Sequence, residues 1–471
     1  WYFCPIKQNF NGLKVVFNDI DFSFNLSSVL NMGFTTLNGN DFFVPRQVYT
    51  LKFTQQTSRD SPIPIENLTD LLNMTEGRDY RLMADIDATS VLWEPLDVNI
   101  ASLDGNGKTI KLSRFNTSTV GSETSVANYG LFAEIGEDTL IKNLTVQYIT
   151  TELDLSASTY INFGGLAGIN NGTVTNCQVI ARDEFGNRGT IQISSTGSTS
   201  DVFNIAGLVA VNNASISNSR VKDLNLIARG YVAGFVSQNN HKIASSFSDN
   251  IQITNQALSN LSGASAGFVA FNSSGSQITT SYAGGAFVKF YTSNGRQIYE
   301  VDSSIGIQGR TVQIISTVNT GGFVYENYGK ISDSFAGIAL SLDSSSLSGG
   351  FVYANKSSGT IKRCYSVSYV PNIGASEQGN KAHTPFIGPT ADYSSLYNEN
   401  PRQDAIENCF FYDAGFGSEG IKLSEALGIE TMNKFRIGIH IAQVANMWTD
   451  SKEKNLLQFG LLLMMIMLIS I

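Results

Sequence analysis

The segment Ala233-Gly234-Phe235-Val236, followed by the polar residues Ser237-Gln238-Asn239-Asn240, sets the pattern of this chain. Closely similar segments recur six more times, each before a polar, Asn-rich turn: YGLF (129–132), GGLA (164–167), AGLV (206–209), AGFV (266–269), GGFV (321–324) and GGFV (349–352). We interpret one glycine of each of the six later segments as a structural repeat anchor: Gly165, Gly207, Gly234, Gly267, Gly322 and Gly350.

A second signature follows each anchor, an Ile or Val with Ser or Cys three residues later. It occurs at Val174/Cys177, Ile216/Ser219, Ile243/Ser246, Ile278/Ser281, Ile331/Ser334, Ile361/Cys364 and Ile406/Cys409. Two signatures in fixed order with variable insertions predict a solenoid of two or three short strands per unit. Like side chains would then stack into interior columns, and glycine would occupy a corner where a side chain clashes or φ is positive. A β-sandwich is the alternative.

The composition excludes several classes of protein. Charged residues are only 15% of the 471, and the net charge is −9, with 31 Lys and Arg against 40 Asp and Glu. So few basic residues argue against nucleic acid as a partner, because phosphate neutralisation supplies most of that affinity. Abundant Gly, Ser, Thr and Asn disfavour helices, while 11% aromatic residues disfavour disorder.

These repeats resemble the GLUG-motif repeats of bacterial and protist surface proteins. The preceding blocks resemble the usual lead-in to such arrays: 65–72, 80–87, 93–96, 103–110, 129–132 and 141–144. The resemblance covers roughly residues 62–415. It implies an all-β protein, a right-handed parallel β-helix, that acts outside the cell as a stalk, an adhesin-like surface or a spacer.

We expect four segments along the chain. Residues 1–60 are a β segment or cap with short strands near 15–17, 22–24 and 48–53, and residues 61–415 are the β-helix. The insertion at 284–320 departs from the repeat and alternates like a protruding hairpin. Residues 416–455 are irregular, and 456–471 form an apolar tail. That tail is a membrane anchor, a removable lipid-anchor signal or a buried end.

The search for chemistry is largely negative: we expect no catalytic, cofactor-binding or metal-ligating residues and no cofactor. Cys177, Cys364 and Cys409 occupy a slot that Ser fills elsewhere, so we interpret them as buried; Cys364 and Cys409 could pair if their coils are successive. Asp85, Asp87 and Asp104 form the best acidic cluster, and we interpret them as turn-capping residues rather than catalytic or calcium-binding ones.

The chain carries about ten Asn-x-Ser/Thr sequons. Four follow the glycine anchors and are our candidate glycosylation sites, expected along one edge: Asn171, Asn213, Asn272 and Asn355. Chance in an Asn-, Ser- and Thr-rich turn is the alternative explanation for these triplets.

The sequence therefore favours a non-enzymatic extracellular or cell-surface β-solenoid. Its repeat faces would contact carbohydrate or protein partners through stacked Asn, Ser, Thr and Tyr side chains. A spacer within a larger surface protein is a version of the same hypothesis. A carbohydrate-active β-helix enzyme, a polysaccharide lyase or hydrolase, is the alternative, and it would require a column of charged residues on one sheet.

Overall fold

The computed structural model describes residues 13–17, 20–24, 61–117, 126–154, 160–183, 185–194, 202–256, 263–284, 288–293, 296–301, 312–342, 346–366, 368, 383–384, 386–388, 405–407 and 409–411. The chain divides into two units, 1–58 and 59–471. In the first unit, β1 (Leu13–Phe17) pairs antiparallel with β2 (Ile20–Phe24), at two of the expected strands. The expected strand at 48–53 and the segments 416–455 and 456–471 lie outside the described residues.

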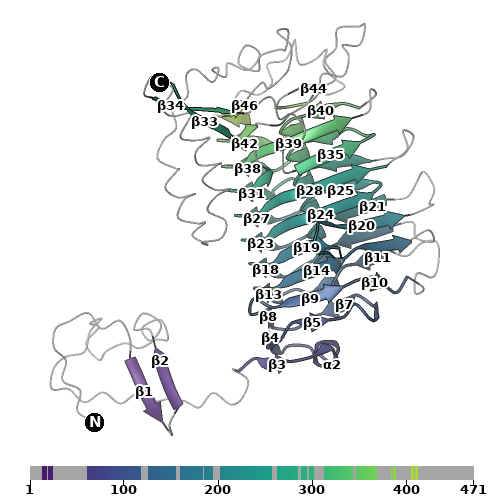
Figure 1. Cartoon of the computed structure of the whole chain (residues 1–471), viewed down its shortest axis with the longest axis vertical. Helices are drawn as coiled ribbons and strands as arrows, with labels where there is room; N and C mark the ends of the chain where they lie inside the picture. Colours follow the sequence, from purple (N-terminus) through teal and green to yellow (C-terminus); the bar gives the residue numbers. More distant parts are fainter. Residues whose placement is uncertain are drawn as a thin grey trace, which may run out of the picture. The chain divides into compact units, whose positions relative to one another are not determined.

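The second unit is a parallel β-helix, which confirms the predicted fold class (Figure 1). Its strands stack into four long parallel sheets, numbered here in the order in which one coil visits them. Sheet 1 contains β11 (Val126–Tyr129), β16 (Tyr160–Gly164), β21 (Val202–Ala206), β25 (Tyr231–Ala233), β29 (Ala264–Ala266), β36 (Thr320–Gly321), β40 (Ser348–Gly349) and β44 (His383–Thr384). Sheet 2 contains β7 (Leu96–Val98), β12 (Phe132–Ile135), β17 (Ala167–Asn170), β22 (Val209–Asn212), β26 (Val236–Asn239), β30 (Val269–Asn272), β37 (Val324–Asn327) and β41 (Val352–Asn355).

Sheets 3 and 4 complete each coil. Sheet 3 contains β3 (Ile63–Ile65), β4 (Asp79–Leu82), β8 (Ser102–Asp104), β13 (Leu140–Lys142), β18 (Thr173–Thr175), β23 (Ser215–Ser217), β27 (Lys242–Ala244), β31 (Gln277–Thr279), β38 (Lys330–Ser332), β42 (Thr360–Lys362) and β45 (Ile406–Glu407). Sheet 4 contains β5 (Ile86–Asp87), β9 (Thr109–Leu112), β14 (Thr145–Ile149), β15 (Thr151–Asp154), β19 (Gln178–Arg182), β20 (Gly189–Ser194), β24 (Arg220–Ala228), β28 (Phe247–Asn255), β32 (Tyr282–Gly284), β35 (Val312–Ser316), β39 (Phe335–Leu342), β43 (Tyr365–Ser366) and β46 (Phe410–Phe411). A short parallel pair, β6 (Leu92–Trp93) with β10 (Arg114–Phe115), lies beside them.

One complete coil therefore holds four strands, not the two or three expected from the sequence. Coil 231–255 runs through β25, β26, β27 and β28 in turn, and each strand pairs with its equivalent in the next coil. The two sequence signatures mark two corners, and a strand lies on each side of both corners. Two signatures per coil therefore correspond to four strands, because each corner separates two of them.

The anchor glycines lie at the corner between sheets 1 and 2, which we call the glycine corner. A Cβ built on Gly207 would lie 2.2 Å from the carbonyl oxygen of Gly234, and one on Gly234 would lie 2.1 Å from that of Gly267. Gly165, Gly267 and Gly322 meet the next anchor in the same way. Close approach of backbones, rather than a positive φ, therefore requires glycine here.

The corner between sheets 3 and 4, which we call the Ser/Cys corner, turns through a left-handed residue. In seven successive coils this residue has φ between 49° and 56°: Asn143, Asn176, Asn218, Ser245, Thr280, Asp333 and Arg363. In six of these coils the residue that follows is the buried Ser or Cys of the second signature, and after Asn143 it is the buried Leu144. Ser246 Oγ donates to the carbonyl of Ala244 at 2.8 Å and accepts from the amide of Ser219 at 3.2 Å, so it joins two coils.

The core of the second unit is built from columns of like side chains. The rings of Phe235, Phe268, Phe323, Phe351 and Phe386 stack with centroid distances of 4.6, 4.8, 5.0 and 5.0 Å. Leu166 and Leu208 continue the column, since Leu166 N donates to Leu208 O and Leu208 N to Phe235 O. All of these side chains are buried. Each additional coil thus removes one more apolar side chain from water.

Two features at the margins of the solenoid refine the sequence prediction. The insertion contains an antiparallel hairpin, β33 (Val288–Ser293) with β34 (Arg296–Val301), but β35 returns to sheet 4 and pairs with both β28 and β39. The insertion is therefore shorter than 284–320. At the other end, helix α2 (Leu68–Leu72), capped by Asn67, places the fully buried Leu71 in the core near β3.

Candidate functional site

A second, smaller apolar cluster lies on the outer side of the glycine corner. Ala233, Ala266 and Ala270 are fully buried there, apart from the main core, and Tyr231 and Phe271 pack against them. Only small side chains fit where the two sheets meet. A Cβ on Gly321 would lie 1.9 Å from the carbonyl oxygen of Val324 in the adjoining sheet-2 strand. We call this outer junction of sheets 1 and 2 the seam.

Aromatic residues fill the seam along the later coils. The Tyr231 and Phe271 rings lie 4.8 Å apart edge to face, the Phe271 and Tyr325 rings 5.6 Å apart edge to face, and the Tyr325 and Tyr353 rings stack at 4.8 Å. Asn319 Nδ2 donates to the Tyr353 hydroxyl at 3.0 Å. Burial raises the pKa of Tyr325 and of Tyr353, so both phenols stay neutral. Three of these residues are half-buried: Tyr231, Phe271 and Tyr325.

Amides fill the same seam along the earlier coils. Asn204 Nδ2 donates to Asn162 Oδ1, and Asn162 Nδ2 donates to Asn128 Oδ1, both at 2.9 Å. In the register of sheet 1, Asn204 is the direct neighbour of Tyr231. The amide column therefore leads into the aromatic cluster along one line parallel to the solenoid axis.

Charged groups border the aromatic end of the seam. Glu326 is the register neighbour of Phe271, and its carboxylate accepts from the Tyr328 hydroxyl at 2.9 Å and from Lys356 Nζ at 2.8 Å. The Lys356 ammonium lies 5.8 Å from the centroid of the Tyr328 ring. Burial lowers the pKa of Lys356, but the hydrogen bond and charge of Glu326, with Tyr328 and Tyr353 nearby, together outweigh burial and raise the pKa, which keeps the ammonium charged.

Two asparagine columns lie next to each other where sheet 2 ends. The inner column is buried except at Asn355, which is half-buried. It forms a continuous chain of amide hydrogen bonds of 2.7 to 2.9 Å: Asn170, Asn212, Asn239, Asn272, Asn327 and Asn355. Among the described residues nothing donates to Asn170 Oδ1, because Ile135 occupies the preceding position. The outer column is one residue further along: Asn171 donates to Glu134, Asn213 to Asn171 and Asn240 to Asn213.

The four candidate glycosylation sites all lie at this end of sheet 2, but they are divided between the two columns. Asn171 is half-buried and Asn213 exposed in the outer column. Asn272 is fully buried in the inner column and cannot carry a glycan in the folded coil. Asn355 closes the inner column, and its Nδ2 donates to the carbonyl of Gly359 at 3.1 Å. The physical reason is a register difference of one residue between the two pairs.

The repeat pattern contains a signal for the inner column, although its burial was not predicted. The fifth residue after every anchor glycine is Asn, from Asn170 after Gly165 to Asn355 after Gly350. Asn171 and Asn213 are instead the sixth residue after their anchors. The sequence gave a weaker signal for the seam. Its aromatic residues occupy different positions in their strands, and only the fold at the corner brings them together: Tyr231, Phe271 and Tyr325.

Of the acidic residues singled out from the sequence, Asp87 and Asp104 cap local turns, while Asp85 bonds to the next coil. Asp87 accepts from the amide and the hydroxyl of Thr89, Asp85 accepts from the amide of Thr109, and Asp104 accepts from Asn106 N and Asn143 Nδ2. Within the described ranges, no cluster of His, Cys, Asp and Glu could hold a metal ion. The same part of the chain contains no helix long and apolar enough to cross a membrane.

Comparison with known proteins gives one distant likeness. Over 172 residues, 31% of this chain, the sequence is 29% identical to halomucin of Haloquadratum walsbyi, and the match spans 2% of that protein. No family model matches the chain. No solved structure matches it either. The repeat architecture and this partial likeness are compatible with a surface structural protein.

Proposed function

We propose that this chain is a non-enzymatic, extracellular β-solenoid of the GLUG-repeat kind, and that its seam binds carbohydrate. The observation that carries the proposal is the continuity of the seam. A column of three asparagine amides, Asn128, Asn162 and Asn204, meets an aromatic cluster that begins at Tyr231. The site thus runs across many coils and suits an extended ligand better than a compact one.

The chemistry of the seam matches that of sugar chains. A sugar ring has an apolar C–H face, which an aromatic ring can cover, and hydroxyls, which amide groups can both donate to and accept from. Both kinds of group are present along the line from Asn204 through Tyr231 to Phe271. Coils repeat about every 4.8 Å, so successive coils offer successive contacts to a polymer. A protein ligand is the alternative partner.

The extracellular location is part of the proposal. It draws support from the likeness to a protein named as a mucin and from the resemblance of the repeats to GLUG-motif surface proteins. Asn171 and Asn213 remain candidate glycosylation sites in the outer column. Each uses one hydrogen of its Nδ2 in the column, and an amide nitrogen carries two, so an attached glycan leaves the hydrogen bond possible.

A glycan array with the full chain tests the proposal, and a substitution in the seam tests its location. We expect binding to a linear polysaccharide, and we expect Tyr231→Ala to weaken binding at least tenfold, about 1.4 kcal/mol. Tyr282→Ala is the matched control: Tyr282 is also half-buried and packed against aromatic rings, but those rings are Phe247 and Phe335 on sheet 4. It should leave binding unchanged.

The outcomes separate the candidate functions. Equal losses for both Tyr variants, or no loss for either, would place binding outside the seam. If the array detects no glycan, the carbohydrate proposal fails and a protein ligand or a spacer role takes its place. Shortening of a bound polysaccharide during the assay would favour the β-helix enzyme instead.

A further inference from the structure

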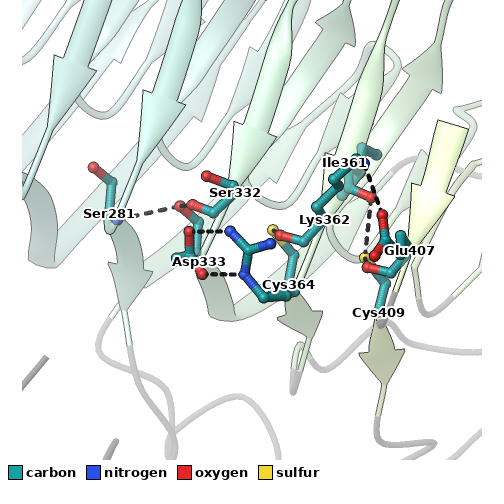
Figure 2. A network of polar contacts seen from close by, with 10 residues as sticks. Ser281, Ser332, Asp333, Ile361, Lys362, Cys364, Glu407 and Cys409 are labelled. Carbon is teal, nitrogen blue, oxygen red and sulfur yellow. Dashed lines mark hydrogen bonds and ion pairs between the residues drawn. The ribbon is translucent and has the colours of Figure 1, made fainter. Parts of the chain in front are cut away.

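Two cysteines occupy equivalent positions in the last two described coils. Cys364 follows β42 and Cys409 follows β45. Their flanking residues pair directly in parallel register: Lys362 with Glu407 before them and Tyr365 with Phe410 after them. Cys364 and Cys409 are therefore stacked neighbours in the Ser/Cys corner, as Figure 2 shows.

The spacing of the two residues suits a covalent bond. Neighbouring strands lie about 4.8 Å apart, and disulfides join residues whose Cα atoms are about 4.4–6.8 Å apart. The Cys409 thiol already reaches the coil of Cys364, since its Sγ lies 3.5 Å from the carbonyl oxygen of Ile361. Both side chains are buried and their sulfurs are unbonded to each other here.

Serine would serve this corner better as a hydrogen-bonding residue. Ser219, Ser246, Ser281 and Ser334 donate to the carbonyl two residues earlier at 2.8–2.9 Å. The thiols of Cys364 and Cys409 make the same contact at 3.2 and 3.4 Å, and a thiol is a weak donor. A pair of adjacent thiols offers something that serine cannot, namely a bond between coils.

We propose that Cys364 and Cys409 form a disulfide in the secreted protein, which fastens the coil of β45 to the coil of β42. The two thiols lose two protons and two electrons as the S–S bond forms. The electrons pass to a protein disulfide or to glutathione disulfide of the secretory route, by thiol–disulfide exchange. The proposal rests on the extracellular location above for its oxidant, but not on carbohydrate binding.

Burial determines when the bond forms. Burial raises the pKa of Cys364 well above that of an ordinary thiol, and the neighbouring thiol of Cys409 raises it further. Exchange proceeds through the thiolate, so it is slow once the coil has closed. We therefore expect oxidation during folding and resistance to reductants until the terminal coil opens.

Peptide mapping tests the proposal. The full chain is secreted from a eukaryotic host and alkylated under denaturing conditions before digestion. We expect a linked peptide that contains Cys364 and Cys409, and an alkylated Cys177. Reduction should lower the Tm by about 5 °C. Cys364→Ser and Cys409→Ser should each abolish that difference, and the double variant should add nothing further. Cys177→Ser should preserve it.

A second thiol pair, engineered inside the solenoid, tests whether the corner allows a disulfide at all. It thereby separates this question from whether the native pair forms one. Cys177 has Ser219 as its stacked neighbour, and its amide donates to Ser219 Oγ at 3.1 Å. Ser219→Cys therefore creates an equivalent thiol pair. If that pair links while Cys364 and Cys409 are recovered alkylated, the corner permits the bond but the native disulfide does not exist, and the proposal is wrong. Failure of both pairs would overturn the geometric argument as well. Glycan binding, measured in the same preparations, reports on the proposed function independently.

Discussion

The glycine corner and the Ser/Cys corner turn the same chain by different means. At the glycine corner, backbones of successive coils approach so closely that a Cβ on Gly234 would overlap the carbonyl oxygen of Gly267. At the Ser/Cys corner, the backbone turns through a left-handed residue, and the next side chain bonds to carbonyl and amide groups of two coils.

This difference explains what each corner tolerates. The glycine corner accepts one residue, because a steric overlap with backbone cannot be relieved by a rotamer change. The Ser/Cys corner accepts Ser, Cys and even Leu144 in its buried slot, and Asn, Asp, Ser, Thr or Arg in its left-handed slot. At these two corners, the steric demand thus gives a strict sequence pattern and the hydrogen-bonding demand a permissive one.

The most severe test of the comparison is Gly234→Ala. The added methyl would lie 2.1 Å from the carbonyl oxygen of Gly267, so the coils must separate locally. We expect a loss of about 3 kcal/mol or more, measured as a lower unfolding midpoint in denaturant by far-UV circular dichroism. A loss below about 1 kcal/mol would show that the coils yield easily and that the corner is not sterically controlled.

Gly275→Ala is the matched control for this substitution. Gly275 has φ of +82° but nothing within 4 Å of a built Cβ, so only the backbone conformation opposes alanine. We expect a cost of about 1 kcal/mol. The difference between the two variants isolates the contribution of close backbone approach.

The Ser/Cys corner is tested by two substitutions at Ser246. Ser246→Ala removes the acceptor of the buried Ser219 amide and the bond to Ala244, and we expect a loss of about 1–3 kcal/mol. Ser246→Cys keeps a small polar group, as Cys177 does naturally, and should cost less. Denaturation midpoints of both variants check the order. Equal losses would mean that the volume of the side chain, not its polar atom, matters here.

The sequence predicted the architecture because steric demands repeat faithfully. The anchors from Gly165 to Gly350 and the Leu/Phe column recur in fixed positions, so the parallel β-helix could be inferred from the pattern alone. The number of strands per coil could not, since strands such as β36 and β40 are only two residues long and carry no periodicity. Parallel pairing with neighbouring coils, not local propensity, makes them strands.

The candidate site was harder to predict for a related reason. The seam joins outward side chains of sheets 1 and 2, and Tyr231 meets Phe271 only because consecutive coils are stacked. The division of the sequons between buried and outer columns depended on a register of one residue, which separates Asn272 from Ser273. Such details depend on which residues pair between coils. The repeat pattern shows this pairing only when each position is numbered from its anchor glycine.

A smaller and opposite effect is expected at the left-handed slot. Thr280 has φ of 51°, although a β-branched side chain is disfavoured in that conformation, and Asn occupies the slot in three other coils: Asn143, Asn176 and Asn218. Thr280→Asn should therefore stabilise the protein by about 0.5–1 kcal/mol, seen as a higher unfolding midpoint. A decrease would mean that the Thr280 side chain makes contacts worth more than the relieved strain.

The smallest expected effect concerns acid stability at the start of the Ser/Cys corner. Burial raises the pKa of Asp104, but hydrogen bonds from Asn143 and Asn106, with Lys142 and Arg81 nearby, outweigh it and lower the pKa below the ordinary value of 3.8. A carboxyl whose pKa falls on folding stabilises the protein above its ordinary pKa, and this contribution is lost as the pH falls through the folded value. Asp104→Asn keeps the acceptor for Asn143 but loses the charge. We expect the variant to be less stable at pH 7 by less than about 1 kcal/mol, and the difference in Tm to vanish in strong acid. A difference that is independent of pH would assign the effect to packing rather than to charge.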